Sequence, residues 1–215
     1  VPGFVKAFAA RDIRKAYDIL RRSNLLPEMC AQVCPSEVQC EGGCLESIFC
    51  QNAIPIRDIQ LVACRIARRE GYTGVRLPEQ EIGRRIAVVG GGPTGIACAA
   101  ALLEKGYRVE LYEQASVLGG TPHFVIPEDR YETAGGEVDA LLAPAVKAGR
   151  LILRTGQALG EQVVLADLER KYDAVFLGMG LGGGEGLGEG VPSGVEEALS
   201  FLRRVKSGER KAVPS

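Results

Sequence analysis

Three glycines and one acid near the middle of the chain have the spacing of a phosphate-binding loop. Gly90, Gly92 and Gly95 fit the pattern G-x-G-x-x-G, and Glu113 follows about 20 residues later. In such a loop the first glycine permits a tight turn, the second lets a pyrophosphate approach the backbone, and the third lets a helix pack closely on a strand. Free N–H groups at the start of that helix then bind the pyrophosphate, and the acid accepts hydrogen bonds from a ribose.

The residues around the glycines have the patterns of a strand, a helix and a second strand. Residues 86–89 form an apolar run rich in β-branched residues, which is typical of a buried parallel strand. The Ala-rich segment from Ile96 to Lys105 predicts a helix, and residues 109–113 predict a second strand that ends at Glu113. Because all these features occur in order, a glycine turn of some other α/β protein is disfavoured, and a Rossmann-like domain is indicated.

The residues that follow the loop indicate which dinucleotide it binds. A carboxylate at Glu113 disfavours NADP, whose 2′-phosphate would face it, and leaves FAD or NAD. Gly119 and Gly120 follow shortly afterwards, and a second glycine pair near the flavin phosphates is typical of FAD-binding Rossmann domains. We therefore expect FAD. Residues 173–180 predict another buried strand that ends in glycines, which would place Gly180 at the edge of the sheet where a nucleotide lies.

Cysteines are the second group of residues with clear chemical potential. The chain has seven, and five of them fall in one short segment: Cys30, Cys34, Cys40, Cys44 and Cys50. The first four are separated by three, five and three residues. Thiolates can ligate an iron–sulfur cluster or zinc, or pair as disulfides, so this segment predicts a metal site or a covalent staple.

A cluster is favoured among these three possibilities. Disulfides are disfavoured, because no secretory signal is visible and a flavin domain usually operates in a reducing compartment. Structural zinc typically uses ligand pairs two to four residues apart plus a more distant pair, whereas these cysteines crowd together. Pro35 after Cys34 is similar to the Cys-Pro step of ferredoxin-type runs. Cys64 and Cys98 lie in apolar helical patterns and are expected to be inert buried thiols.

The chain divides into units of different character, and the expected fold class is α/β. Residues 1–72 predict a small all-α iron–sulfur domain that buries little surface and needs a staple. Residues 84–192 predict an incomplete FAD-binding Rossmann-like domain, a parallel sheet with flanking helices. Residues 193–215 predict a helix and an interdomain linker; the family resemblance given below implies that this linker leads toward a missing NAD(P)H-binding domain.

Composition excludes several other functions. The net charge of −1 gives no electrostatic footprint for nucleic acid. The longest apolar run, Ile96 to Leu103, is too short to span a bilayer, so we expect no membrane insertion and a cytoplasmic protein. His123 is the only histidine, which excludes histidine-rich metal sites. No side chain has the pattern of an acid–base catalyst, and His123 and Tyr131 are expected near the flavin or on the surface.

Together these motifs resemble a known group of proteins. The segments CAQVCPSEVQCEGGC, GRRIAVVGGGPTGIACAAALLEKGYRVELYE and YDAVFLGMG are similar to the small (β) subunit of bacterial glutamate synthase. They are equally similar to the N-terminal region of dihydropyrimidine dehydrogenase. The resemblance covers nearly the whole chain. It implies an oxidoreductase that carries FAD and 4Fe–4S clusters and passes electrons from NAD(P)H to a partner subunit or domain.

The resemblance also implies roles for individual residues. Cys34 and Cys40 would ligate one cluster and Cys44 a neighbouring one, while Cys30 belongs to the motif without a settled role. Gln60 stands where dihydropyrimidine dehydrogenase places a glutamine ligand, although a solvated helix residue is the alternative. The positions that match FAD contacts are Gly90, Gly92, Pro93, Thr94, Gly95, Glu113, Gly120 and Gly180.

Two parts of the family pattern are missing, which leaves two functional classes open. The family has a further cysteine cluster upstream and an NAD(P)H-binding domain downstream. We therefore expect a fragment, or a piece whose complement is a larger catalytic subunit or a downstream domain, and we expect the isolated chain to be inactive with NAD(P)H. The alternative is a non-catalytic, zinc- or thiol-stabilised interaction module that docks to a larger enzyme.

Overall fold

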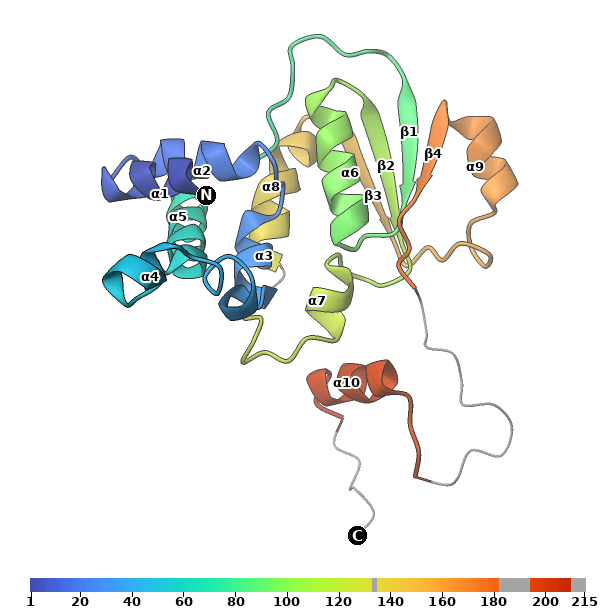
Figure 1. The fold of residues 1–215 in the computed structure, drawn as a ribbon. Coiled ribbons are helices and arrows are strands. Elements are labelled where there is room, and N and C mark those ends of the chain that lie inside the picture. The colour runs from blue at the N-terminus through green and yellow to red at the C-terminus, as the bar shows by residue number, and fades with distance from the viewer. Residues whose placement is uncertain (133–134, 182–193, 210–215) are drawn as a thin grey trace.

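A four-stranded parallel sheet forms the centre of the molecule (Figure 1). The computed structural model describes residues 1–132, 135–181 and 194–209. In spatial order the strands are β3 (Leu151–Thr155), β2 (Arg108–Glu113), β1 (Arg85–Val89) and β4 (Ala174–Leu177). Every neighbouring pair is parallel, which confirms the expected α/β class with a parallel sheet.

Helices cover both faces of this sheet. Successive residues of a strand point to opposite faces, so Val88 and Leu111 pack with helices α6 (Pro93–Glu104) and α8 (Gly135–Lys147). On the other face, Ala87, Val89 and Tyr112 pack with Leu168 of α9 (Leu165–Lys171). The strands β1 and β2, the glycine loop and α6 agree with the sequence prediction to within a few residues. The strand expected to be buried at 173–180 is shorter, and the expectation of burial is wrong: β4 lies at the edge of the sheet, with Ala174 and Leu177 exposed.

Five short α-helices precede the sheet in the described part of the chain. They are α1 (Pro2–Ala9), α2 (Ile13–Arg21), α3 (Pro27–Val33), α4 (Glu46–Cys50) and α5 (Ile56–Arg69), with a 3₁₀ turn at Ser36–Val38. Helix α2 begins where Asp12 accepts a hydrogen bond from the Lys15 N–H, at 3.0 Å. Phe4, Tyr17 and Ile56 belong to a small core of their own between α1, α2 and α5.

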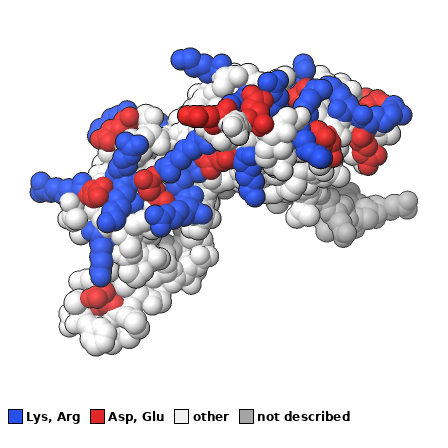
Figure 2. Space-filling view, turned by 90° about the horizontal axis from the view of Figure 1, so that it is seen from above, with Lys and Arg blue, Asp and Glu red and all other residues white. Residues whose placement is uncertain are grey.

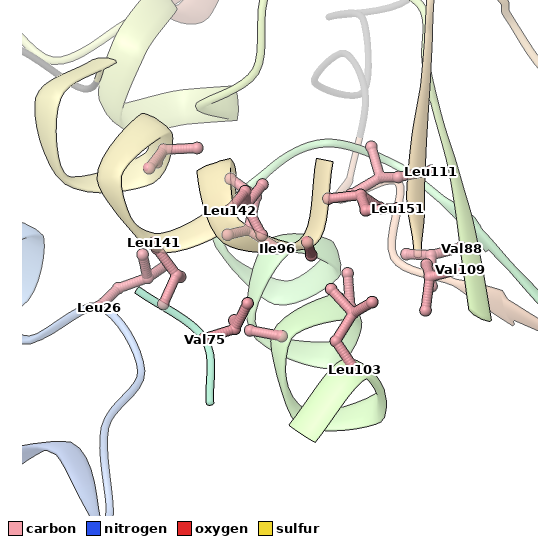
Figure 3. Close-up of a cluster of buried hydrophobic side chains, with 14 of the residues drawn as sticks. Leu26, Val75, Val88, Ile96, Leu103, Val109, Leu111, Leu141, Leu142 and Leu151 are labelled. Carbon is pink, nitrogen blue, oxygen red and sulfur yellow. The ribbon is translucent and has the colours of Figure 1, made fainter. Parts of the chain in front are cut away.

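Helix α3 of this unit belongs to a different core. Leu26 and Met29 are buried with residues of α6, α8 and the sheet, and the connecting segment adds Val75. Figure 3 shows Leu26 and Val75 pointing into the same cluster as Leu141. The division into residues 1–72 and 84–192 stays a prediction, but the two parts share one hydrophobic core at α3.

Buried charges reinforce this junction. The Glu137 carboxylate on α8 accepts hydrogen bonds from the backbone N–H groups of Glu28 and Met29, both at 2.7 Å, and so caps the start of α3. The Glu28 carboxylate in turn accepts two hydrogen bonds from Arg68 on α5, at 2.9 and 3.0 Å. Three helices are thus joined through two buried carboxylates.

Two further helices lie beyond the carboxyl end of β2. Helix α7 (Gly120–Phe124) follows the second glycine pair, and α10 (Ala198–Lys206) packs beside it (Figure 1). The Lys206 ammonium donates hydrogen bonds to the carbonyl oxygens of Pro122 and Ile126, at 2.9 and 2.5 Å. The last part of the predicted Rossmann-like domain, residues 182–192, lies outside the described residues. Among those that are described, none of the helices has the length and hydropathy to cross a bilayer.

We expect the substitution Glu137→Gln to reduce the pH dependence of the free energy of unfolding. Burial raises the pKa of Glu137 to about 7, from an ordinary value of 4.5. The folded chain therefore binds more protons than the unfolded chain between these values, so the contribution of Glu137 to the free energy of unfolding is greatest at low pH. It falls as the pH rises through 7, by an amount on the order of 3 kcal/mol.

Urea unfolding at a series of pH values measures this effect. The difference between the original chain and Glu137→Gln should change with pH, whereas Asp139→Asn, at an exposed position of the same helix, is the matched control. Parallel pH profiles for the original chain and Glu137→Gln would contradict the assignment.

Candidate functional site

The glycine loop lies between the end of β1 and the start of α6. Gly90 has φ +108°, a conformation that side chains rarely adopt, and a Cβ there would lie 2.3 Å from the Gly178 carbonyl oxygen. A Cβ on Gly95 would lie 1.8 Å from the Gly90 carbonyl oxygen. The packing of the chain itself therefore requires both glycines. The sequence predicted this: a tight turn at Gly90 and a close helix–strand contact at Gly95.

Gly92 has a different reason to be glycine. It lies at the N-cap of α6 with φ −79°, which any residue can adopt, and the nearest atom to a Cβ there is the Gly120 Cα at 3.7 Å. The fold leaves space at this position, so the protein's own packing does not require a glycine. No side chain caps α6 by a hydrogen bond, which leaves the N-terminal N–H groups of this helix available to a ligand.

The second glycine pair, Gly119 and Gly120, lies against the glycine loop. The Gly119 N–H donates to the Gly91 carbonyl oxygen at 2.8 Å, and a Cβ on Gly120 would lie 2.7 Å from the Gly92 Cα. Gly120 also has φ +57°. Backbone from two segments therefore lines one side of the space at Gly92, where a bulky phosphate group would meet amide groups rather than side chains.

Glu113 is at the end of β2 and its carboxylate is already engaged. One oxygen accepts a hydrogen bond from the Gly91 N–H at 2.6 Å, and the other accepts one from the Ala115 N–H at 2.8 Å. Glu113 thus ties the strand end to the glycine loop. Each carboxylate oxygen has further lone-pair capacity, so these contacts leave room for a ribose hydroxyl.

Gly180 lies beyond β4, at the same edge of the sheet. The Gly178 N–H donates to the Val89 carbonyl oxygen at 2.7 Å, which aligns this strand end with the glycine loop. Gly180 has φ +74°, and among the described residues no atom lies within 4 Å of a Cβ built there. Thr94 is exposed at the start of α6, beside the half-buried Pro93.

The cysteine segment begins in α3 and continues through the following loop. Cys30 lies in α3 and Cys34 is its C-cap, while Cys40 and Cys44 lie in the turns before α4. All four thiols are partly buried and Cys50 is exposed. Burial raises the pKa of Cys34, and the nearby Cys40 and Cys30 raise it further. Three of the thiols are therefore close enough to interact electrostatically.

A carboxylate organises the loop between these cysteines. Glu41 accepts hydrogen bonds from the Ser36 hydroxyl at 2.7 Å and from the Arg57 N–H at 2.9 Å, at the start of α5. The hydrogen bond from the Arg57 backbone, followed by that from Ser36, lowers the pKa of Glu41. Gly42 closes the turn, because a Cβ there would lie 2.2 Å from the Glu37 carbonyl oxygen.

The thiols do not form a finished ligand set. Within the described ranges, no group of three or more His, Cys, Asp or Glu side chains is arranged to hold a metal ion. The donor set still has the right chemistry, since the thiols at Cys34, Cys40 and Cys44 lie on one folded loop with soft sulfur donors. Binding of a cluster would require the thiol side chains to converge.

Gln60 lies on α5 and faces α3. Its Nε2 donates a hydrogen bond to the Pro27 carbonyl oxygen at 2.8 Å, and the side chain is half-buried. The residue is therefore not a freely solvated helix position. This contact fixes the amide against the helix that carries Cys30.

Other residues that the sequence singled out have clear places. Cys64 is buried in the helical core, as expected, whereas Cys98 on α6 is only partly buried. His123 is half-buried, with its ring packed edge-on against Phe124. Tyr131 is 1% exposed, so it is a core residue rather than a surface one.

Comparison with known proteins finds two protein-family models that match parts of the chain. Residues 1–72 match the model of a protein family described as dihydropyrimidine dehydrogenase domain II, 4Fe-4S cluster. Residues 88–134 match the model of a family described as NAD(P)-binding Rossmann-like domain.

Several curated proteins are similar over most of the chain. The glutamate synthase [NADPH] small chain of Escherichia coli strain K12 is 31% identical over 84% of this chain, and that of Azospirillum brasilense is 29% identical over the same share. The NAD-dependent dihydropyrimidine dehydrogenase subunit PreT of Escherichia coli strain K12 is 30% identical over 97% of this chain.

The chain spans only part of these relatives, 37% of the glutamate synthase small chains and 50% of PreT. The resemblance drawn from the sequence motifs is nevertheless confirmed by both family matches and by the relatives. The chain combines a 4Fe–4S cluster domain of the dihydropyrimidine dehydrogenase type with a Rossmann-like nucleotide-binding domain, and it is a relative of glutamate synthase small chains and dihydropyrimidine dehydrogenase subunits.

Proposed function

We propose that this chain is an electron-transfer module of an NAD(P)H-dependent oxidoreductase, which relays electrons between FAD and 4Fe–4S clusters to or from a partner subunit. The observation that carries the proposal is the backbone-lined space at Gly92, in the same folded body as the cysteine loop. When bound, the two groups would supply the redox chemistry, while the chain positions them and controls their surroundings.

The glycine loop would hold FAD. Gly92, Thr94 and Gly120 would present backbone to the pyrophosphate, while Gly90 and Gly95 fix the shape of the loop. Glu113 would accept hydrogen bonds from the ribose with the lone pairs that Gly91 and Ala115 leave free. Pro93 would start the helix without a competing N–H donor, and Gly180 would leave the opposite side of the space open.

The helical domain would hold the cluster. Cys34, Cys40 and Cys44 would supply thiolates, and Gln60 would supply its amide oxygen as a further ligand, since its Nε2 is already bound to α3. The Glu41 contacts hold the two ends of the loop against α5, so that cluster binding has to move thiol side chains rather than build the loop anew.

The partner is proposed from the relatives. Their names describe a small chain and a subunit, so we propose that a larger catalytic subunit or a downstream NAD(P)H-binding domain completes the electron path. The seven free cysteines suit the reducing cytoplasm, where we place the protein.

A second function has one observation in its favour. Val38, Leu45, Ile48 and Phe49, around the cysteines, are exposed, and a patch of exposed apolar side chains is typical of a docking surface. This observation favours the alternative, a thiol- or zinc-stabilised module that docks to a larger enzyme. An absorption spectrum of the anaerobically purified chain separates the two. Flavin bands together with the broad absorption of an iron–sulfur cluster support electron transfer, and a colourless protein containing zinc overturns it.

The first prediction compares two glycines of the same loop. Gly92→Ala should leave folding stability unchanged, because a Cβ fits there, but should weaken FAD binding by about tenfold or more, because the methyl group would meet the pyrophosphate. Gly95→Ala should instead destabilise the fold by about 1–3 kcal/mol or more. Thermal unfolding and flavin titration measure both. Normal FAD affinity in Gly92→Ala would show that the loop is not the phosphate site.

The second prediction concerns the cluster ligands. Cys40→Ser should lower the iron content of the purified chain and destabilise residues 1–72, because loss of a thiolate removes folding energy as well as iron. Cys98→Ser, on α6, is the control and should keep its iron. Equal iron in both variants after anaerobic purification would refute the ligand assignment.

The third prediction is that the purified chain with FAD does not oxidise NADH or NADPH. Hydride transfer needs a nicotinamide ring held against the flavin, and the sequence has one complete G-x-G-x-x-G loop between a strand and a helix. Dye reduction should begin only when a second nucleotide-binding domain, the downstream one proposed above, is added. Rapid NAD(P)H oxidation by the chain alone would mean that the loop holds the nicotinamide nucleotide instead.

A further inference from the structure

A second cavity lies at the opposite end of α6 from the glycine loop. Its volume is about 560 Å³, and it opens between the end of α2 and the end of α6 (Figure 1). Leu25 and Ala101 contribute apolar surface, and six charged residues line the rest: Asp18, Arg21, Arg22, Arg76, Glu104 and Lys105. This volume is in the range of small-molecule sites.

Two of the four cationic side chains are held by ion pairs. Arg21, whose side chain is 5% exposed, donates from Nη2 to Glu104 at 2.6 Å. Arg76 pairs with Asp18, and its backbone N–H donates to the same Glu104 carboxylate at 3.0 Å. Both acids of the cavity are therefore neutralised by its own walls.

The other two cations are left without a counter-charge. Arg22 directly follows α2 and Lys105 directly follows α6, and neither forms an ion pair with a residue that the structure describes. Each helix end contributes about half a negative charge, which offsets about one of the two positive charges. A net positive charge of about one therefore remains at the cavity. It comes from cations at the ends of both helices.

A buried donor in the cavity wall also lacks an acceptor. The Nε of Arg21 is buried and has no hydrogen-bond partner among the described residues. Buried guanidinium groups normally satisfy their N–H donors. The whole chain has a net charge of −1, and on the face shown in Figure 2 Lys and Arg lie among Asp and Glu, so the excess of positive charge at this cavity is local.

We propose that this cavity binds a small dianionic metabolite, a phosphate monoester or a dicarboxylate, between Arg22 and Lys105. Guanidinium and ammonium groups are the side chains that bind such anions. The ligand would join α2 of the helical domain to α6 of the Rossmann-like domain and so stabilise their contact. This site is separate from the proposed FAD and cluster sites.

Calorimetric titration of the purified chain tests the proposal with two probes, inorganic phosphate and succinate, at constant ionic strength set by sodium chloride. The test variant is Arg22→Ser with Lys105→Ser, both exposed. The matched control is Arg69→Ser with Lys147→Ser, which removes two exposed cations from the last turns of α5 and α8. We expect saturable binding that is about tenfold or more weaker in the test variant and unchanged in the control.

Each outcome decides the question. Binding of phosphate alone assigns a phosphate ester, binding of succinate alone assigns a dicarboxylate, and binding of both supports a site for either. The absence of saturable binding overturns the proposal, as does equal weakening in both variants. Phosphate binding that is insensitive to Arg22 and Lys105 also overturns it, since the anion would then lie elsewhere, for example at the glycine loop. Flavin and iron contents, measured on the same samples, report separately on the proposed function.

Discussion

One buried carboxylate fixes the relation between the two chemical centres. Glu137 extends from α8 to the first N–H groups of α3, which are 109 and 108 residues away in sequence. Its two hydrogen bonds cap the helix that leads into the cysteine loop, and they do so beside the core formed by Leu26 and Met29. A helical domain of about 70 residues buries a small share of its surface and is only marginally stable by itself. Its placement on the Rossmann-like domain therefore depends on this cap and on the core around it.

The cap has consequences on both sides of the junction. Arg68 balances Glu28, so the two carboxylates at the start of α3 share a cation rather than only repelling each other. Gln60 lies about two turns before Arg68 on α5. It binds the same helix, α3, through the Pro27 carbonyl oxygen. The cysteine helix is thus held by α5 as well as by α8, and the proposed FAD and cluster sites are joined through this packed interface.

The sequence predicted what local patterns determine. The apolar strands, the glycine loop and α6 follow from periodicity and from glycine spacing over fewer than about 30 residues. Glu113 was expected to bind a ribose, but its contacts with Gly91 and Ala115 were not foreseen, because the acid is followed by a turn whose geometry only the fold determines. The contacts of Glu137 and Lys206 could not be predicted, since nothing in a single sequence indicates which distant backbone groups a charged side chain will meet.

The two candidate sites differ in how much of each is built by folding. The glycine loop consists of backbone, so once β1, β2 and α6 pack, its shape is complete and a ligand finds it already formed. The cysteine loop is closed by Ser36, Glu41 and Gly42, but its thiols do not converge in the described chain. Cys40 packs against the core of α1, α2 and α5, but Val38, Leu45, Ile48 and Phe49 are 69–79% exposed, so most apolar side chains of this loop are not held in place by a core. Metal–thiolate bonds can supply that missing order, because ligand binding and folding share the same free energy. The nucleotide site is therefore set by the chain alone, whereas the order of the cysteine loop would come from what it binds.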